Sequence, residues 1–175
     1  MPYKAAAWGY VGSDLIPSVA AIKQALCQYG PLAISVEVTG PFHAYTNGVF
    51  NACAGGWGAL TQYAMGDLVK SAAGYIYQAT AAGRSGTVQP AWPLPTAADR
   101  HPTVTDGTVT WQCLDMVNHA ITLVGWDDAR GAWLIKNSWN TWWGESGYMW
   151  ISYNCNNVGL GTAWVQSAPP DENCN

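Results

Sequence analysis

One stretch in the C-terminal part of the chain constrains the fold more than any other. Residues 120–126 form an apolar run that predicts a buried strand, and residues 133–136 form a second run of this kind. The sequence Asp-Asp-Ala-Arg-Gly at 127–131 lies between them and is typical of a turn. The two runs therefore predict a β-hairpin, and a third strand is expected at residues 148–153.

The N-terminal third predicts a helix followed by a strand. Ser18 is a favourable N-cap, and apolar residues recur after it with helical spacing until the Gly-Pro pair at 30–31 ends the helix. Over residues 32–38, apolar side chains alternate with Ala, Ser and Glu, which indicates a half-buried strand. Further short strands are expected at residues 8–12 and 48–50.

The composition changes in the middle of the chain. Residues 55–112 are rich in Gly, Ala, Thr and Pro, and we interpret them as a small β module inserted into the main domain. Strand candidates lie between its turn signals, at residues 67–69, 75–78 and 108–111. The main domain is then discontinuous and comprises residues 1–54 and 113–175. The predicted fold class is α+β, mostly β, with one short helix.

Composition excludes several kinds of function. Lys and Arg number 7 against 11 Asp and Glu, and no basic run occurs, so a nucleic-acid partner is not expected. No apolar run reaches membrane-spanning length, and no signal peptide is recognisable. The cysteines have no metal-ligand spacing, so neither a metal nor another cofactor is predicted.

His119 and Asn137 lie near the open end of the predicted hairpin. The first strand starts beside the point where the second ends, because hairpin strands are antiparallel. If Trp126 pairs near Ala132, His119 falls opposite Trp139, and Asn137 is its diagonal neighbour on the same face. A register shifted by one residue would place His119 and Asn137 on opposite faces.

An imidazole beside a carboxamide is a catalytic arrangement. The amide oxygen accepts a hydrogen bond from one ring nitrogen and fixes the tautomer, so the other nitrogen can exchange a proton with a nucleophile. An Asn orients the ring without adding a charge, which suits a thiolate–imidazolium pair. We predict His119 and Asn137 as catalytic residues. Cleft or shielding positions are predicted for Asn118, Ala120, Trp139 and Trp143, with core filling as the alternative for the two tryptophans. His43 and His101 are predicted to be surface residues.

Three linked motifs carry a family resemblance. They are Val-Asn-His-Ala-Ile-Thr-Leu-Val-Gly-Trp at 117–126, Trp-Leu-Ile-Lys-Asn-Ser-Trp at 133–139 and Trp-Trp-Gly-Glu-Ser-Gly-Tyr at 142–148. Together they resemble the C-terminal half of papain-like cysteine peptidases. The resemblance extends over about residues 3–53 and 114–166. It implies the barrel-like half of a two-domain peptidase, with His119 as general base and acid and Asn137 as its orienting partner.

Two departures from the family pattern are visible. Asn140 stands where the family has a glycine after Asn-Ser-Trp, a mild change because Asn tolerates a left-handed backbone. The Cys-Gly-Ser-Cys-Trp-like run that supplies the nucleophile in the family's N-terminal helical half does not occur. Cys27 falls in the helix after that half, at a non-catalytic position. We interpret the chain as starting at the domain seam, with the other half supplied upstream or in trans.

The insert has a weaker resemblance. Its Gly-Asp-Leu-Val, Gly-Arg-Ser-Gly, Pro-Ala-Trp-Pro and Asp-Gly-Thr-Val-Thr-Trp runs look like small modules of phage tail and bacterial surface proteins. This likeness implies attachment to a surface ligand and slightly favours a location outside the cell or on a phage or cell surface. Its three tryptophans, Trp57, Trp92 and Trp111, are expected to be core residues more than a sugar platform.

The five cysteines leave pairing open. Cys27 is expected to be a buried helix residue. Cys53 and Cys113 flank the insert and would staple its base, while Cys53 with Cys155 is closer to the habit of the family. Free thiols are a third possibility, and no pairing is predicted for Cys174.

Three hypotheses of function follow. The first is a cysteine peptidase half that hydrolyses peptide or protein substrates when completed by a Cys-bearing half. The second is a non-catalytic binding or structural protein that uses the insert for recognition. The third is a truncated reading frame. The first predicts no peptide cleavage by this chain alone.

Overall fold

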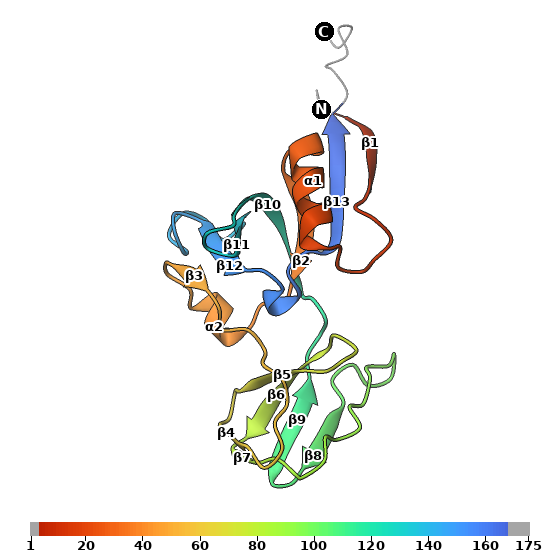
Figure 1. Ribbon diagram of the computed structural model, residues 1–175, viewed down its shortest axis with the longest axis vertical. Coiled ribbons are helices and arrows are strands. Elements are labelled where there is room, and N and C mark those ends of the chain that lie inside the picture. Colours follow the sequence, from red (N-terminus) through yellow and green to blue (C-terminus); the bar gives the residue numbers. More distant parts are fainter. Residues whose placement is uncertain (1–3, 168–175) are drawn as a thin grey trace, which may run out of the picture. The chain divides into compact units, whose positions relative to one another are not determined.

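The computed structural model describes residues 4–167, which fold as parts of two compact units (Figure 1). Unit 1 comprises Met1–Ala52 and Val117–Asn175, and unit 2 comprises Cys53–Met116. The predicted insert, residues 55–112, falls inside unit 2. Residues 1–3 and 168–175 lie outside the described residues. No helix within residues 4–167 is long and apolar enough to cross a membrane.

Unit 1 is a seven-stranded sheet with one long helix. The strand order is β1-β13-β2-β10-β11-β12-β3, and neighbours are antiparallel except for β12 and β3. The elements are β1 (Ala5–Tyr10), α1 (Val19–Tyr29), β2 (Leu32–Val36), α2 (Gly40–His43), β3 (Val49–Phe50), β10 (His119–Asp127), β11 (Ala132–Lys136), β12 (Tyr148–Ser152), a 3-10 turn (Cys155–Asn157) and β13 (Leu160–Ser167).

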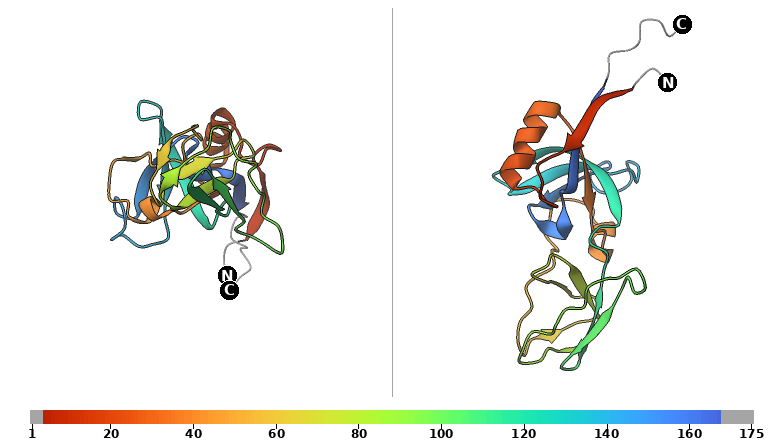
Figure 2. Two further views of the ribbon diagram at one scale, coloured as in Figure 1. Left: turned by 90° about the horizontal axis from the view of Figure 1, so that it is seen from below. Right: turned by 90° about the vertical axis from the view of Figure 1, so that its right-hand side faces the viewer.

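The helix α1 begins and ends at the predicted residues. The Ser18 hydroxyl accepts a hydrogen bond from the Ala21 N–H at 3.2 Å, and Gly30 ends the helix at φ +78°, which favours glycine. The buried stripe of α1 comprises Ile22, Ala25 and Leu26, and the helix packs on β13, β10 and β2. Figure 2 shows α1 beside β13.

Cys27 corrects one expectation about this helix. Its side chain is exposed, not buried. The reason is helical geometry: Cys27 follows Leu26, the last residue of the buried stripe, and the next residue of a helix points about 100° away.

One face of the sheet forms the core of unit 1. On β2, buried and solvent-accessible residues alternate with the period of two that the sequence predicted. The segment of β10 was predicted as a buried strand, but it alternates in the same way over residues 119–123, where Ala120 and Thr122 are exposed. The core includes Leu32, Ile34, Val36, Leu123, Trp133, Ile135, Met149 and Ile151, each at most 2% exposed.

The hairpin of β10 and β11 has a register that differs from the assumed one near its turn. Trp126 pairs with Trp133, one residue away from the pairing assumed, and a β-bulge between Leu123 and Gly125 then shifts the ladder. Beyond the bulge, Thr122 pairs with Lys136, as the assumed register requires. The bulge therefore restores the predicted relation at the open end of the hairpin.

Unit 2 contains a four-stranded antiparallel sheet of order β5-β6-β9-β8 and a small β4–β7 pair. The strands are β4 (Gln62–Tyr63), β5 (Leu68–Lys70), β6 (Ile76–Ala81), β7 (Gly83–Arg84), β8 (Thr103–Asp106) and β9 (Val109–Cys113). The three strands that the sequence predicted are present, as β5, β6 and β9. The strands β4, β7 and β8 were not predicted.

The tryptophans of unit 2 belong to its interior. Trp111 is fully buried, and Trp92 packs against Tyr77 with ring centroids 4.4 Å apart. Trp57 donates its indole N–H to the buried carboxylate of Asp106 at 2.7 Å. The expectation of core residues is confirmed for Trp111, and none of the three is laid out as an exposed platform.

Candidate functional site

The structure brings His119 and Asn137 together. Nε2 of His119 lies 2.9 Å from Oδ1 of Asn137, within hydrogen-bond range. His119 is half-buried at the start of β10, and Asn137, directly after β11, is only 3% exposed. The predicted contact between the two side chains is confirmed.

A second hydrogen bond fixes the orientation of the Asn137 amide. Oδ1 also accepts from the backbone N–H of Ser138 at 2.7 Å. A backbone N–H can only donate, so the atom that receives it is the amide oxygen and not the NH2 group. Because that oxygen can only accept, Nε2 of His119 must carry a proton. In the neutral imidazole, the lone pair then resides on Nδ1, which is the basic position of the site.

Trp139 covers the pair. Its ring lies 5.1 Å from the His119 ring, centroid to centroid, and is tilted by 31°. The predicted packing of Trp139 over the imidazole is confirmed. An aromatic ring in this position excludes water from the Nε2–Oδ1 hydrogen bond, which strengthens it.

His43 is a neighbour of the site that sequence reasoning missed. Its ring stacks on Trp139 at 4.5 Å and 27°, so Trp139 contacts two imidazoles, those of His43 and His119. His43 is exposed, as expected, but it is not an isolated surface residue. It lies at the end of α2, a four-residue helix too short for its period to be recognised.

Trp143 follows the alternative of core filling. It is 2% exposed and lies beneath Trp139, with ring centroids 5.1 Å apart at 83°. Its ring also stacks on Phe42, and its indole N–H donates to the carbonyl of His43 at 3.1 Å. Trp143 is therefore a core residue that supports Trp139 and does not line a cleft itself.

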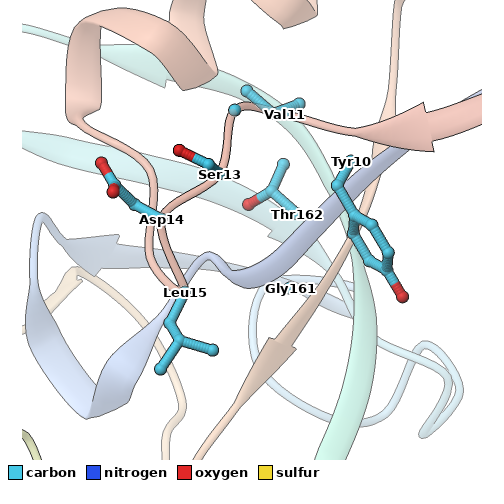
Figure 3. Close-up of a pocket in the computed structure, with 8 residues that line it drawn as sticks. Tyr10, Val11, Ser13, Asp14, Leu15, Gly161 and Thr162 are labelled. Carbon is cyan, nitrogen blue, oxygen red and sulfur yellow. The ribbon is translucent and has the colours of Figure 1, made fainter.

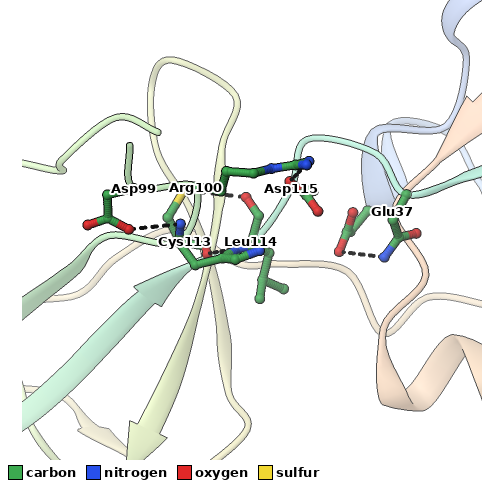
Figure 4. A network of polar contacts seen from close by, with 8 residues as sticks. Glu37, Asp99, Arg100, Cys113, Leu114 and Asp115 are labelled. Atoms are coloured by element: carbon green, nitrogen blue, oxygen red, sulfur yellow. Dashed lines mark hydrogen bonds and ion pairs between the residues drawn. The ribbon is translucent and has the colours of Figure 1, made fainter. Parts of the chain in front are cut away.

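Asn118 and Ala120 flank the imidazole in different ways. Asn118 accepts from the Val38 N–H at 2.8 Å and donates to the Val38 carbonyl and the Glu37 carboxylate. Figure 4 draws Glu37 in this network. Asn118 thus anchors the start of β10 to the chain after β2. Ala120 is exposed and lines a shallow hollow beside Asn137.

The loop after Asn137 is held by backbone and side-chain contacts. Asn140 adopts φ +70°, the left-handed conformation anticipated from the glycine that it replaces. The Asn137 N–H donates to the Gly147 carbonyl at 2.9 Å. Glu145 accepts from both the Tyr45 hydroxyl and the Gly48 N–H at 2.8 Å. Burial, with the hydrogen bond to Glu145 as a second cause, raises the pKa of Tyr45.

Cys27 and Cys113 lie in different settings. Cys27 is exposed in the last turns of α1, where the helix dipole opposes negative charge. Cys113 is fully buried in the core of unit 2, and its Sγ donates to the Leu114 carbonyl. Reactive cysteines need an electropositive, partly exposed setting.

Cys53 and Cys155 are both disulfide-bonded. They are the two cysteines of the pairing that the family resemblance favours. Cys113 retains its thiol, so the alternative bridge at the base of the insert is not formed. Cys174 lies outside the described residues. Among residues 4–167, no cluster of three His, Cys, Asp or Glu could hold a metal ion.

Comparisons with known proteins agree with the motifs. Residues 96–168 match the model of the papain family of cysteine proteases. "Gamete and mating-type specific protein A" of Dictyostelium discoideum is 52% identical over 44 residues, which are 25% of this chain and 10% of that protein. The viral cathepsin of Choristoneura fumiferana defective polyhedrosis virus is 36% identical over 80 residues, 43% of this chain and 25% of that protein.

A comparison with solved structures finds a plant protease. The bromelain protease from Ananas comosus, solved with the E64 inhibitor, has a TM-score of 0.49 and 16% identity. The match covers 93% of this chain and 50% of that one. The chain thus spans about half of the solved protease, and a quarter or less of the curated relatives named above. Residues 96–168, which include His119 and Asn137, are similar to the papain family of cysteine proteases, and unit 1 is mostly β.

Proposed function

We propose that this chain supplies the histidine and asparagine of a cysteine peptidase whose nucleophilic thiol comes from a second polypeptide half. The observation that carries the proposal is the Nε2–Oδ1 hydrogen bond, because it leaves the Nδ1 lone pair of His119 as the basic position. The substrates would be peptides or proteins. The chain alone should not cleave them.

The chemistry follows from this tautomer. Nδ1 takes the proton of an approaching thiol, and the thiolate attacks the carbonyl carbon of the scissile peptide bond. The imidazolium then gives its proton to the leaving amine, so the C–N bond breaks and a thioester remains. A water molecule, deprotonated by Nδ1, attacks the thioester, and the acid and the thiol are released. Asn137 holds the ring throughout and adds no charge.

A fusion protein tests the proposal. The half of the bromelain protease that this chain does not cover would be joined to the N-terminus of this chain by a flexible linker, which raises the effective concentration to roughly millimolar. The measurement is the rate at which the introduced thiol is alkylated by iodoacetamide. We expect fast alkylation, and His119→Ala should slow it by about 10²-fold or more because general bases contribute about 10²–10⁴.

Asn137→Ala is the companion variant. It should slow alkylation less than His119→Ala, because the imidazole remains but its tautomer and orientation are no longer fixed. Equal alkylation rates in the unaltered fusion and in His119→Ala would contradict the proposed function.

Recognition through unit 2 is the alternative function. Deleting residues 57–112 distinguishes recognition by unit 2 from catalysis by unit 1. Unit 1 has its own core, so we expect it to stay folded without these residues. A deletion variant that keeps fast alkylation in the fusion would assign the chemistry to unit 1 alone. Loss of all folded structure on deletion would count against the two-unit description.

A further inference from the structure

The ring of Trp139 covers the His119–Asn137 hydrogen bond, but it is itself only half-buried. Two core rings meet it at nearly right angles. The centroids of Phe42 and Trp143 lie 6.0 and 5.1 Å from that of Trp139, at 85° and 83°. A half-exposed ring keeps its position only if its neighbours restrict it, so the other contacts of Trp139 decide how firmly the pair is covered.

His43 makes the shortest ring contact of Trp139 within residues 4–167. The two centroids lie 4.5 Å apart and the planes are inclined by 27°, which is the geometry of a stacked pair. No ion pair among these residues includes His43. The indole is therefore the surface on which this exposed imidazole rests.

The backbone of His43 is fixed from the core. Its N–H donates to the Thr39 carbonyl at 3.0 Å, and its carbonyl accepts from the indole N–H of Trp143 at 3.1 Å. Trp143 is 2% exposed, so it contacts Trp139 directly and also anchors the residue that stacks on it. The imidazole reaches Trp139 from a backbone that is already held, so less conformational entropy opposes the stack.

An imidazole suits this exposed position because it is planar and has a polar edge. Its flat face lies on the indole, while its ring nitrogens can hydrogen-bond to water. An alanine at position 43 would remove the stacked ring. A phenylalanine would keep the flat contact but not the nitrogens, so these two replacements separate stacking from polarity.

A second candidate is weaker. A hollow of about 370 Å³ lies between the loop of residues 11–15 and β13 (Figure 3). Ser13 and Asp14 are among its polar side chains, and nothing within residues 4–167 indicates what would fill it. The His43 stack differs because it adjoins the proposed catalytic pair.

We propose that His43 is a positioning residue, whose imidazole clamps Trp139 over the His119–Asn137 hydrogen bond. Without this clamp, Trp139 moves more freely and water reaches the Nε2–Oδ1 hydrogen bond more often. The His119 ring is then less firmly oriented, and its basic Nδ1 faces a thiol for less of the time. The catalytic consequence rests on the proposed function, whereas the clamp is a property of this chain alone.

The exchange of the His119 Nε2 proton with solvent, measured by NMR on this chain alone, tests the clamp. His43→Ala should speed the exchange about threefold, because one aromatic contact changes a population by a factor of this order. His43→Phe should restore the original rate. His101→Ala is the matched control, since it removes an exposed imidazole from unit 2 and should change nothing.

A double-mutant cycle shows whether His43 acts through Trp139. In the Trp139→Ala background, His43→Ala should cause no further acceleration, because the ring that it clamps is gone. The melting temperature of His43→Ala should stay close to that of the unaltered chain, since the side chain is exposed. A residue that only stabilised the fold would lower the melting temperature and would act with or without Trp139.

The fusion with the bromelain half measures the catalytic consequence. His43→Ala should slow alkylation of the introduced thiol about threefold, in step with the faster exchange. His43→Phe should restore the rate, and His101→Ala should leave it unchanged. Equal alkylation in His43→Ala and in the unaltered fusion would overturn the catalytic consequence.

The outcomes distinguish the clamp from the proposed function. Exchange at the unaltered rate in His43→Ala, or a further acceleration by it in the Trp139→Ala background, would overturn the clamp. Faster exchange in His43→Phe as well would show that stacking is not the cause and would also overturn it. If the unaltered fusion is alkylated no faster than its His119→Ala variant while exchange still responds to His43→Ala, the proposed function fails and the clamp stands.

Discussion

Asn137 in unit 1 and Asp106 in unit 2 are both buried polar side chains, but their surroundings differ. Asp106 accepts from the indole N–H groups of Trp57 and Trp111 and from the Gly86 N–H, so both carboxylate oxygens are used. Asn137 uses its oxygen on His119 and Ser138, while its Nδ2 has no acceptor within residues 4–167. The Asp106 network is closed on itself, whereas the Asn137 amide keeps one buried donor that no group within residues 4–167 accepts. Under the proposed function, the chemistry belongs to unit 1.

The strongest test of this comparison is Asp106→Ala. The variant leaves three donors without their acceptor, and each buried unsatisfied donor costs about 1–3 kcal/mol. We expect unit 2 to unfold at a much lower temperature, measured by near-UV circular dichroism of its tryptophans. Asp99→Ala removes an exposed carboxylate of the same unit and serves as control. Equal melting of both variants would show that Asp106 does not hold the unit together.

Trp139→Ala tests the Asn137 half of the comparison, in unit 1. Removing the ring exposes the His119–Asn137 hydrogen bond to water without changing either partner. We expect the Nε2 proton to exchange with solvent about tenfold faster, measured by NMR, because a hydrogen bond in a low-dielectric setting is stronger. Trp142→Ala is the matched control, since Trp142 is 74% exposed on the same loop. An unchanged exchange rate in Trp139→Ala would remove the shielding role.

Thiol reactivity offers a smaller but clear contrast between the units. Cys27 is exposed in unit 1 and Cys113 is buried in unit 2. Cys27→Ala should therefore lose one thiol that reacts with Ellman's reagent in the native protein, whereas Cys113→Ala should lose none. A native Cys113 that reacts as readily as Cys27 would show that the core of unit 2 opens.

The smallest expected effect concerns the exposed cluster of Lys23, Asp128 and Tyr153. The hydrogen bond to Lys23, followed by that from Tyr153, lowers the pKa of Asp128 from its usual 3.8. A lowered carboxyl pKa contributes stability that is present above 3.8 and lost as the pH falls through the folded value.

Thermal melts between pH 2 and pH 5 measure this contribution. Lys23→Met should lose slightly less stability on acidification than the unaltered chain, because exposed ion pairs contribute little. A steeper acid dependence in Lys23→Met would have the wrong sign and would contradict the assignment.

Much of unit 1 could be predicted because its signals are local. Ser18 and the Gly-Pro pair mark the ends of α1, and alternation marks β2. The strand β13 was not recognised as a separate element, because Gly161 at φ +64° and a register shift between Leu160 and Ala163 interrupt its period. The short α2 carries no periodic signal, so His43 could not be placed on Trp139.

The contact between His119 and Asn137 was predicted correctly from a register that is partly wrong. The assumed pairing of Trp126 with Ala132 does not occur, and the bulge between Leu123 and Gly125 compensates for it. No residue in that stretch predicts a bulge, because a single glycine such as Gly125 could also belong to a regular strand. The position of a bulge depends on side-chain contacts between strands, and a single sequence does not show these contacts.

The bulge also determines what changes of length the hairpin tolerates. Successive residues of a strand point to opposite faces of the sheet. The number of residues between His119 and Asn137 therefore decides whether both side chains lie on the same face. Losing one residue from the turn, or the extra residue at the bulge, would turn Asn137 toward the other side of the sheet. Inserting or deleting two residues would keep His119 and Asn137 on the same face. Insertions and deletions in this hairpin should therefore be tolerated in even steps, whatever the sequence of the turn.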